Sequence, residues 1–149
     1  MDAIFLEDLS PGQVFTAGPV TVSEDEVIAF ARQFDPQPFH TDPDAARGSM
    51  FGGLALSGWH TAALAMRMLV DSPLARIANG LVGLEIRHMR WPRPARPGDT
   101  LALTVEIIET KPSRSRPGWG TAVLHWTVRN QRDETVLDLE NVAWVARRP

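Results

Sequence analysis

The period of the hydrophobic pattern changes near residue 79. Before this point apolar residues recur at helical spacing, apart from a segment at residues 13–22 that predicts a strand broken at Gly18-Pro19. After it, long runs rich in Val, Leu and Thr are typical of strands. The chain is therefore predicted to have a mainly helical front half and a β-rich back half.

Two longer helices are predicted in the front half. The first begins at Ser23, where Glu26 completes a capping-box pattern, and it ends before Pro36 because a residue that precedes proline avoids α geometry. The second covers residues 58–70, GWHTAALAMRMLV, with Ser57 as its N-cap. This run is apolar on nearly every side, so it predicts a helix that its surroundings bury.

The back half contains four strand candidates joined by turn-rich segments. Successive strands with short connections favour an antiparallel meander, and the simplest packing wraps that sheet around the one apolar helix. The sequence therefore predicts a single α+β domain over residues 1–149, with an antiparallel sheet around a long central helix. The strand candidates are LVGLEIRHMRW, DTLALTVEIIET, GTAVLHWTVRN and TVLDLENVAWVA.

Composition narrows the classes of function. The chain has no cysteine, which excludes disulfides, thiolate metal sites and cysteine nucleophiles. Its net charge of −3 gives no bulk attraction to nucleic acid or to an anionic membrane, so neither is expected as a partner. No apolar run approaches the ~20 residues of a membrane span, and the start MDAIFLEDLSPG lacks the basic region of a secretory signal. A cytoplasmic location is expected.

The stretch DPQPFH joins an acid to a histidine through two prolines. Asp35 stands at the partly negative end of the first helix, which predicts a raised pKa and the role of a general acid. His40, with an ordinary pKa near neutrality, can act as a base or hold water. The stretch must curve for the two groups to meet. The alternative is an ordinary polar helix exit with no chemistry.

Gly58 opens the second helix, where backbone N–H groups have no partner inside the helix. A glycine there admits close approach by a ligand, and its N–H can hold a carbonyl oxygen as that oxygen gains negative charge. The alternative is a small residue chosen for packing. An acid, a base and such a donor are the parts needed to add water to a bond conjugated to a carbonyl.

Other polar residues allow two interpretations each. Gln37, Thr41 and Ser57 can orient water or substrate, or merely cap turns. The four arginines and one tryptophan of residues 87–99 can bind the phosphates and adenine of coenzyme A, or form a solvated corner. The remaining histidines, His60, His88 and His125, have no ligand-like spacing, so no metal site is expected.

FDPQPFH, followed by TDPDAA, FGG, SGWHTAALAMRML and RPGDTL, resembles the MaoC-like dehydratases, the (R)-specific enoyl-CoA hydratase family with the hotdog fold. By this resemblance Asp35 and His40 match the catalytic dyad, and Gly58 matches the residue whose N–H polarises the thioester carbonyl. The implied reaction is reversible syn hydration of a trans-2-enoyl-CoA to a 3-hydroxyacyl-CoA. It needs no cofactor, since coenzyme A is part of the substrate, and it implies a role in fatty acid metabolism.

The chain departs from the family pattern near both halves of the site. Gln37 stands where the family usually has Asn, Ser57 replaces the usual His, and Trp59 follows where Met is common. These changes leave the acyl preference open, and the bulky Trp59 is expected to narrow the pocket. Because a single hotdog exposes a sheet edge, a homodimer with the coenzyme A cleft near its interface is also expected.

Two other functions fit the same fold. A hotdog thioesterase commonly places Asp or Glu on the central helix, but residues 57–70 contain neither, which ranks this alternative lower. A non-catalytic acyl-CoA-binding module needs no acid and histidine pair, so the presence of Asp35 and His40 argues against it.

Overall fold

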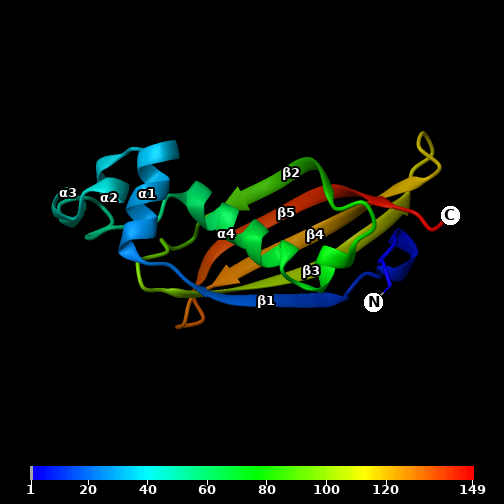
Figure 1. Cartoon of the computed structure of the whole chain (residues 1–149), viewed down its shortest axis with the longest axis horizontal. Helices are drawn as coiled ribbons and strands as arrows, with labels where there is room; N and C mark the ends of the chain where they lie inside the picture. Colours follow the sequence, from blue (N-terminus) through cyan, green and yellow to red (C-terminus); the bar gives the residue numbers. More distant parts are fainter. Residues whose placement is uncertain (1) are drawn as a thin grey trace.

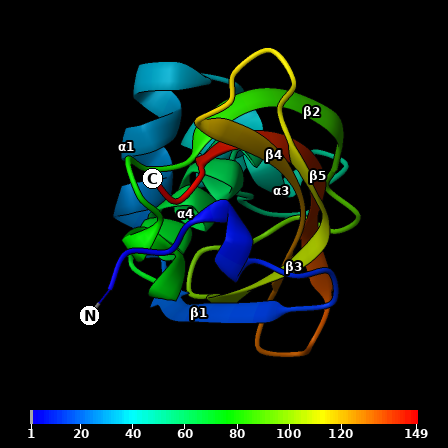
Figure 2. The ribbon, with the colours of Figure 1, turned by 90° about the vertical axis from the view of Figure 1, so that its right-hand side faces the viewer.

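The computed structural model describes residues 2–149, in which one five-stranded antiparallel sheet curves around a helix (Figure 1). The strand order is β1-β3-β4-β5-β2. Seen along the sheet, the strands form an open curve with the helix α4 inside it (Figure 2). The predicted α+β hotdog arrangement is thereby confirmed. The strands are β1 (Val14–Thr21), β2 (Val82–Arg90), β3 (Thr100–Pro112), β4 (Trp119–Arg129) and β5 (Thr135–Ala146).

The central helix α4 spans Gly58–Val70, as its apolar run predicts, but the predicted burial on nearly every side is wrong, since Trp59, Met66 and Val70 are 58%, 49% and 46% exposed. Its inner face is fully covered, and Ala65 at 0% exposure lets the sheet approach closely. The strands oppose it with alternating large apolar side chains, such as Leu101, Leu103 and Val105 on β3, each 1% exposed or less. Alternation at a period of two places this set on the concave face and leaves the other face polar.

The predicted meander is only partly correct. Strands β3, β4 and β5 do follow one another, but β2 pairs with β5 instead of β3. The connection from β2 to β3 must therefore cross the end of the sheet at the start of α4. It is held there because Leu56 N–H donates to Ala95 O at 2.9 Å and Gly98 N–H donates to Val22 O at 2.7 Å. This crossing segment becomes one wall of the site.

Three further helices lie together beyond the start of α4 (Figure 1). Helix α1 spans Glu24–Phe34, and the Ser23 hydroxyl accepts the N–H of Glu26 at 3.2 Å, as its cap pattern predicts. Two short helices follow, α2 (Pro38–Thr41) and α3 (Pro43–Arg47). No helix within residues 2–149 is long and apolar enough to cross a bilayer.

The stretch from Asp35 to His40 is more ordered than the sequence suggests. Its two prolines end α1 as predicted, but its second half is the helical turn α2. Pro38 at the first position of this turn supplies a helical φ angle at a place where its missing N–H costs nothing. The turn shortens the path and brings His40 back toward the end of α1.

Close packing of the sheet predicts that Gly120 on β4 tolerates no side chain. A Cβ there would collide with Cδ2 of Leu6 and lie 2.6 Å from the carbonyl oxygen of Lys111. Gly120→Ala should therefore lower the free energy of unfolding by about 1–3 kcal/mol. Gly118→Ala is the control, since a Cβ on Gly118 meets nothing within 4 Å. Urea denaturation measures both, and equal stability of the two variants would contradict the packing.

Candidate active site

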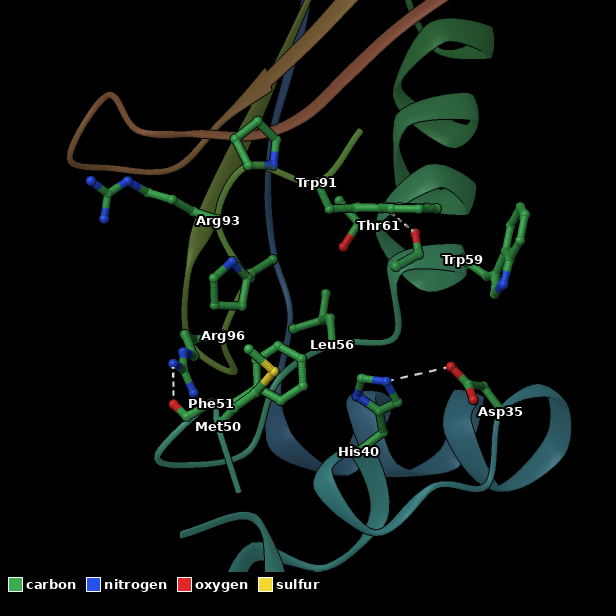
Figure 3. A pocket seen from close by; sticks show the side chains of 14 residues that line it. Asp35, His40, Met50, Phe51, Leu56, Trp59, Thr61, Trp91, Arg93 and Arg96 are labelled. Carbon is green, nitrogen blue, oxygen red and sulfur yellow. Dashed lines mark hydrogen bonds and ion pairs between the residues drawn. The ribbon is translucent and has the colours of Figure 1, made fainter. Parts of the chain in front are cut away.

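A cavity of about 620 Å³ opens where the start of α4, the turn α2 and the crossing segment meet (Figure 3). Asp35 and His40 lie on one side of it, and Trp91 and Arg93 of the crossing segment lie on the other. Gly58 lies between them at the first position of α4. The stretch from Asp35 to His40 and the helix start at Gly58, which were predicted to form one site, therefore border the same cavity.

The acid and the histidine face each other across the cavity floor. Asp35 is the C-cap of α1 and His40 belongs to α2, and Nε2 of the histidine lies 3.4 Å from Oδ2 of the aspartate. Their side chains are only 15% and 6% exposed. The chain thus curves as the pairing requires, and the two groups form a largely buried dyad.

One hydrogen bond fixes the tautomer of His40. Its Nδ1 lies 2.7 Å from the carbonyl oxygen of Ala55, and a carbonyl can only accept, so Nδ1 carries the proton. In the neutral ring Nε2 then presents a lone pair toward Asp35 and the cavity. The dyad therefore offers two acceptors side by side, a ring nitrogen and a carboxylate oxygen.

The electrostatics of Asp35 correct the sequence prediction. Burial favours a higher pKa, but hydrogen bonds from Ser57 and Gln37, together with the charge that His40 carries when it is protonated, outweigh it and lower the pKa of Asp35. The Ser57 hydroxyl donates to Oδ2 at 2.7 Å, and Gln37 Nε2 donates to Oδ1 at 2.6 Å. The expected raised pKa is wrong because these direct donors from other segments stabilise the carboxylate. The ionised form of Asp35 is thus favoured.

The structure separates the roles of Gln37, Thr41 and Ser57. Gln37 and Ser57 both hold the Asp35 carboxylate, whereas the Thr41 hydroxyl donates to the backbone oxygen of Gln37 at 3.1 Å. Ser57 stands at the N-cap position of α4 as predicted, but its side chain makes no capping bond there. Its hydroxyl instead donates to Asp35, which lies 22 positions earlier in the chain. Sequence spacing does not reveal this contact.

Position 58 requires glycine because another residue of the same chain, Trp91, approaches it closely. A Cβ at this position would lie 2.6 Å from Cε2 of Trp91, whose Nε1 donates to Gly58 O at 2.9 Å. Trp91 thereby fastens the crossing segment to the start of α4. Within residues 2–149 no acceptor is bonded to the Gly58 N–H, which belongs to the helix turn that borders the cavity.

Two indoles form the rim of the cavity. The rings of Trp59 and Trp91 pack edge to face with centroids 5.7 Å apart. Trp59 is 58% exposed and borders both this cavity and an apolar groove between α4 and β2. Figure 3 shows its ring beyond the first turn of α4, on the side away from Arg93. Trp59 thus contributes to the mouth of the cavity more than to its floor.

The arginines of residues 87–99 do not form one group. The Arg96 guanidinium donates to the backbone oxygens of Phe51 and Gly53, so it fastens a loop that forms part of the wall. Arg93 pairs with Glu134 at 3.1 Å but remains 64% exposed at the cavity. The structure therefore leaves Arg93, and not Arg96, available to an anion.

Sequence reasoning missed several wall residues. Thr61 is one helical turn after Gly58, so its place on the same face of α4 follows from the helical period. Phe51 and Leu56 lack such a signal, because the loop that places them depends on Arg96 from a distant segment. All of these line the cavity: Met50, Phe51, Leu56, Thr61, Pro92, Pro94 and Ala95.

The chain belongs to the MaoC-like family. The family model described as "MaoC like domain" matches residues 8–127, which include the dyad, Gly58 and most of the sheet. The family expected from the sequence motifs is thereby confirmed.

Individual relatives agree with this assignment. A crystal structure of a MaoC-like dehydratase from Rhodospirillum rubrum shares 45% identity with a TM-score of 0.93, over 99% of each chain. The uncharacterized protein YdeM of Bacillus subtilis is 31% identical over 91% of this chain and 94% of its own length. The (R)-hydratase from A. caviae involved in PHA biosynthesis has the same fold, with a TM-score of 0.74 at 24% identity over 96% and 99% of the two chains.

The bonds to Asp35 generate a prediction for Ser57→Ala. Loss of the hydroxyl should raise the pKa of Asp35, because the carboxylate loses a direct donor while its burial remains. A carboxyl with a lowered folded pKa stabilises the fold above its unfolded pKa of about 3.9, and this contribution is lost as pH falls through the folded value. The acid limb of unfolding should therefore move to higher pH in the variant.

NMR titration of the Asp35 carboxyl carbon measures this pKa directly. Ser72→Ala is a matched control, since the Ser72 hydroxyl donates to Leu69 O beyond the far end of α4 and does not touch the dyad. An unchanged Asp35 titration in Ser57→Ala would show that the hydroxyl does not hold the carboxylate in solution.

Proposed function

We propose that the protein is a hydro-lyase that reversibly adds water to a trans-2-enoyl-CoA thioester and gives a 3-hydroxyacyl-CoA. The observation that supports this most directly is the pair of acceptors, Asp35 Oδ2 and His40 Nε2, placed 3.4 Å apart in one cavity with the Gly58 amide. Two acceptors at this spacing suit the two hydrogens of one water molecule. Membership in the MaoC-like family supports the same class of reaction.

The dyad holds and activates the water. With one hydrogen donated to Asp35 Oδ2 and the other to His40 Nε2, the water oxygen turns a lone pair toward the substrate in the cavity. As this oxygen bonds to the β-carbon, the dyad removes one proton. The lowered pKa keeps Asp35 ionised so that it can accept a hydrogen bond from the water, and the lone pair on His40 Nε2 can accept the proton.

The Gly58 amide stabilises the negative charge that develops on the thioester oxygen. When the C–O bond forms, the electrons of the C=C bond shift toward the thioester oxygen, which becomes an enolate. The Gly58 N–H donates to this oxygen, helped by the positive end of α4. The dyad then returns the proton to the α-carbon on the same face, so that one water is added and the dyad regains its starting state.

The proposed substrate includes coenzyme A, and no other cofactor takes part. The apolar wall of Phe51, Leu56 and Trp91 suits an acyl group, and the exposed Arg93 at the rim suits a phosphate of the coenzyme. Gln37, Ser57 and Trp59 remain the residues that we expect to set the acyl preference. Action on coenzyme A thioesters accords with a cytoplasmic location and with fatty acid metabolism.

One assay tests the reaction and its alternatives. The protein is incubated with crotonyl-CoA and longer 2-enoyl-CoAs, while enoyl absorbance and free thiol are followed. Loss of absorbance without thiol is expected for a hydratase. Release of thiol would instead identify a thioesterase, and neither signal across a wide acyl panel would identify a binding module.

Two variants test whether Asp35 and His40 activate the water. Asp35→Asn and His40→Gln should each lower kcat by about 10²–10⁴-fold, because each replaces a group that can take a proton from the water with an amide that cannot. Asp44→Asn is the control, since its side chain is 83% exposed on α3 and bonds only Arg47. Full activity of either dyad variant would overturn the site assignment.

We also propose that the protein is a homodimer joined through β2. This strand lies at the edge of the sheet and exposes three large apolar side chains, Val82, Leu84 and Ile86, at 47%, 52% and 57%. An edge strand with unpaired backbone groups and apolar side chains is suited to pairing with a second copy. The apolar groove that Trp59 borders also reaches Ile86, so the acyl site would adjoin this interface.

Sedimentation equilibrium tests the dimer. The wild-type protein should sediment as twice its chain mass, and the double variant Leu84→Lys, Ile86→Lys should shift toward the monomer. Ile108→Lys is the control, because Ile108 is similarly exposed at 39% but belongs to the internal strand β3. A wild-type monomer at all accessible concentrations would exclude this pairing.

A further inference from the structure

Two histidines and an aspartate meet on the face of the sheet that α4 does not cover. His88 Nε2 lies 3.1 Å from Asp138 Oδ1, and His125 Nε2 lies 2.8 Å from the same oxygen. The three ligand atoms all lie within 4.8 Å of one another. This cluster takes no part in the dyad cavity.

The strand register explains why the cluster forms. On β5, Glu140 is directly opposite His125 of β4 on one side and His88 of β2 on the other. Directly opposed residues share a face of a sheet, and Asp138, two residues along β5, shares it too. The histidines are separated from Asp138 by 50 and 13 residues, so linear spacing conceals a group that the sheet assembles.

The donor set suits a transition metal. Two neutral imidazoles and one carboxylate bind Zn²⁺ and neighbouring divalent ions, with bonds of about 2.0–2.2 Å. A tetrahedral ion with such bonds needs ligand atoms about 3.3 Å apart, so side-chain movements on the order of 1 Å convert the observed triangle into a coordination site. Three protein ligands leave the remaining positions to water.

The charge of the cluster also favours a cation. Asp138 brings a carboxylate, and both histidine nitrogens converge on its single oxygen Oδ1. Both histidine nitrogens face an oxygen that can only accept, so without a metal each needs a proton to bond it. A metal ion can take the place of these two protons, because both would point at the same oxygen, Oδ1 of Asp138. Glu140 adds a second carboxylate beside the cluster, partly offset by Arg87 at 3.9 Å.

We propose that His88, His125 and Asp138 bind one divalent first-row transition metal ion, for which Zn²⁺ is the probe. The ion ties the edge strand β2 to β4 and β5. Because all three ligands stand on strands of one sheet, their backbone positions are fixed before the ion binds, which limits the entropy lost. The ion stabilises the fold and the edge strand, and it does not enter the reaction at Asp35 and His40.

Equilibrium dialysis against Zn²⁺ with elemental analysis tests the site in the full chain. We expect one ion per chain for the wild type, and at least a tenfold loss of affinity for His88→Gln, His125→Gln and Asp138→Asn. Glu109→Gln is the matched control, since Glu109 is a carboxylate of β3 that lines a different pocket on the same sheet face, beside Val123 and Val142. It should bind as the wild type does.

A second measurement separates a metal site from a hydrogen-bond network. Zn²⁺ at about a hundredfold excess over its Kd should raise the wild-type Tm by roughly 5–10 °C and leave the His125→Gln Tm unchanged. Co²⁺ should give the visible absorption of a tetrahedral site in the wild type only. If the wild type binds no ion, or if His125→Gln binds Zn²⁺ equally well, the proposal is overturned. If the three residues form only a hydrogen-bond network, the variants should have a lower Tm, and zinc should leave the Tm of the wild type unchanged.

Discussion

Helix α4 is apolar on nearly every side, and the sheet curves around it and covers its inner side, while Trp59, Met66 and Val70 remain exposed on the other. This single requirement fixes the positions of most other elements. The curve leaves the first turn of α4 as the open end of the fold, where the crossing segment from β2 to β3 and the helices α1 to α3 must close it. Trp91 holds that closure in place by donating to Gly58 O at 2.9 Å. The cavity exists because these pieces cover the end of a buried helix without filling it.

The chemistry of the cavity depends on bonds that cross between these pieces. Ser57 at the start of α4 and Gln37 before α2 both donate to the Asp35 carboxylate, and the backbone of Ala55 orients His40. The result is an anion and a ring lone pair that face the same space. In the proposed reaction, these two acceptors hold the water and take a proton from it. Ser57 and Gln37, which depart from the family pattern, thus both hold the Asp35 carboxylate in place.

The two faces of the sheet serve different purposes. The concave face is largely apolar and holds α4, whereas the convex face carries polar side chains that adjacent strands bring into rows. Such rows can gather residues from distant parts of the chain on a rigid surface, as His88, His125 and Asp138 show. The edge strand β2 takes part in both the proposed metal site and the proposed dimer, so an ion there would also hold the strand through which two copies meet.

The sequence by itself determined the elements, because caps, prolines and hydrophobic periods act over a few residues. Ser23, the run of residues 58–70 and the four late strands were all placed correctly, and the motif around Asp35, His40 and Gly58 indicated the family. The tertiary structure decided what depends on contacts between distant segments. It placed β2 beside β5, bonded Ser57 to Asp35 and so reversed the expected pKa shift, and gathered the cluster around Asp138. Hydrogen bonds of about 3 Å decide such properties, and only the folded chain brings their partners within that distance.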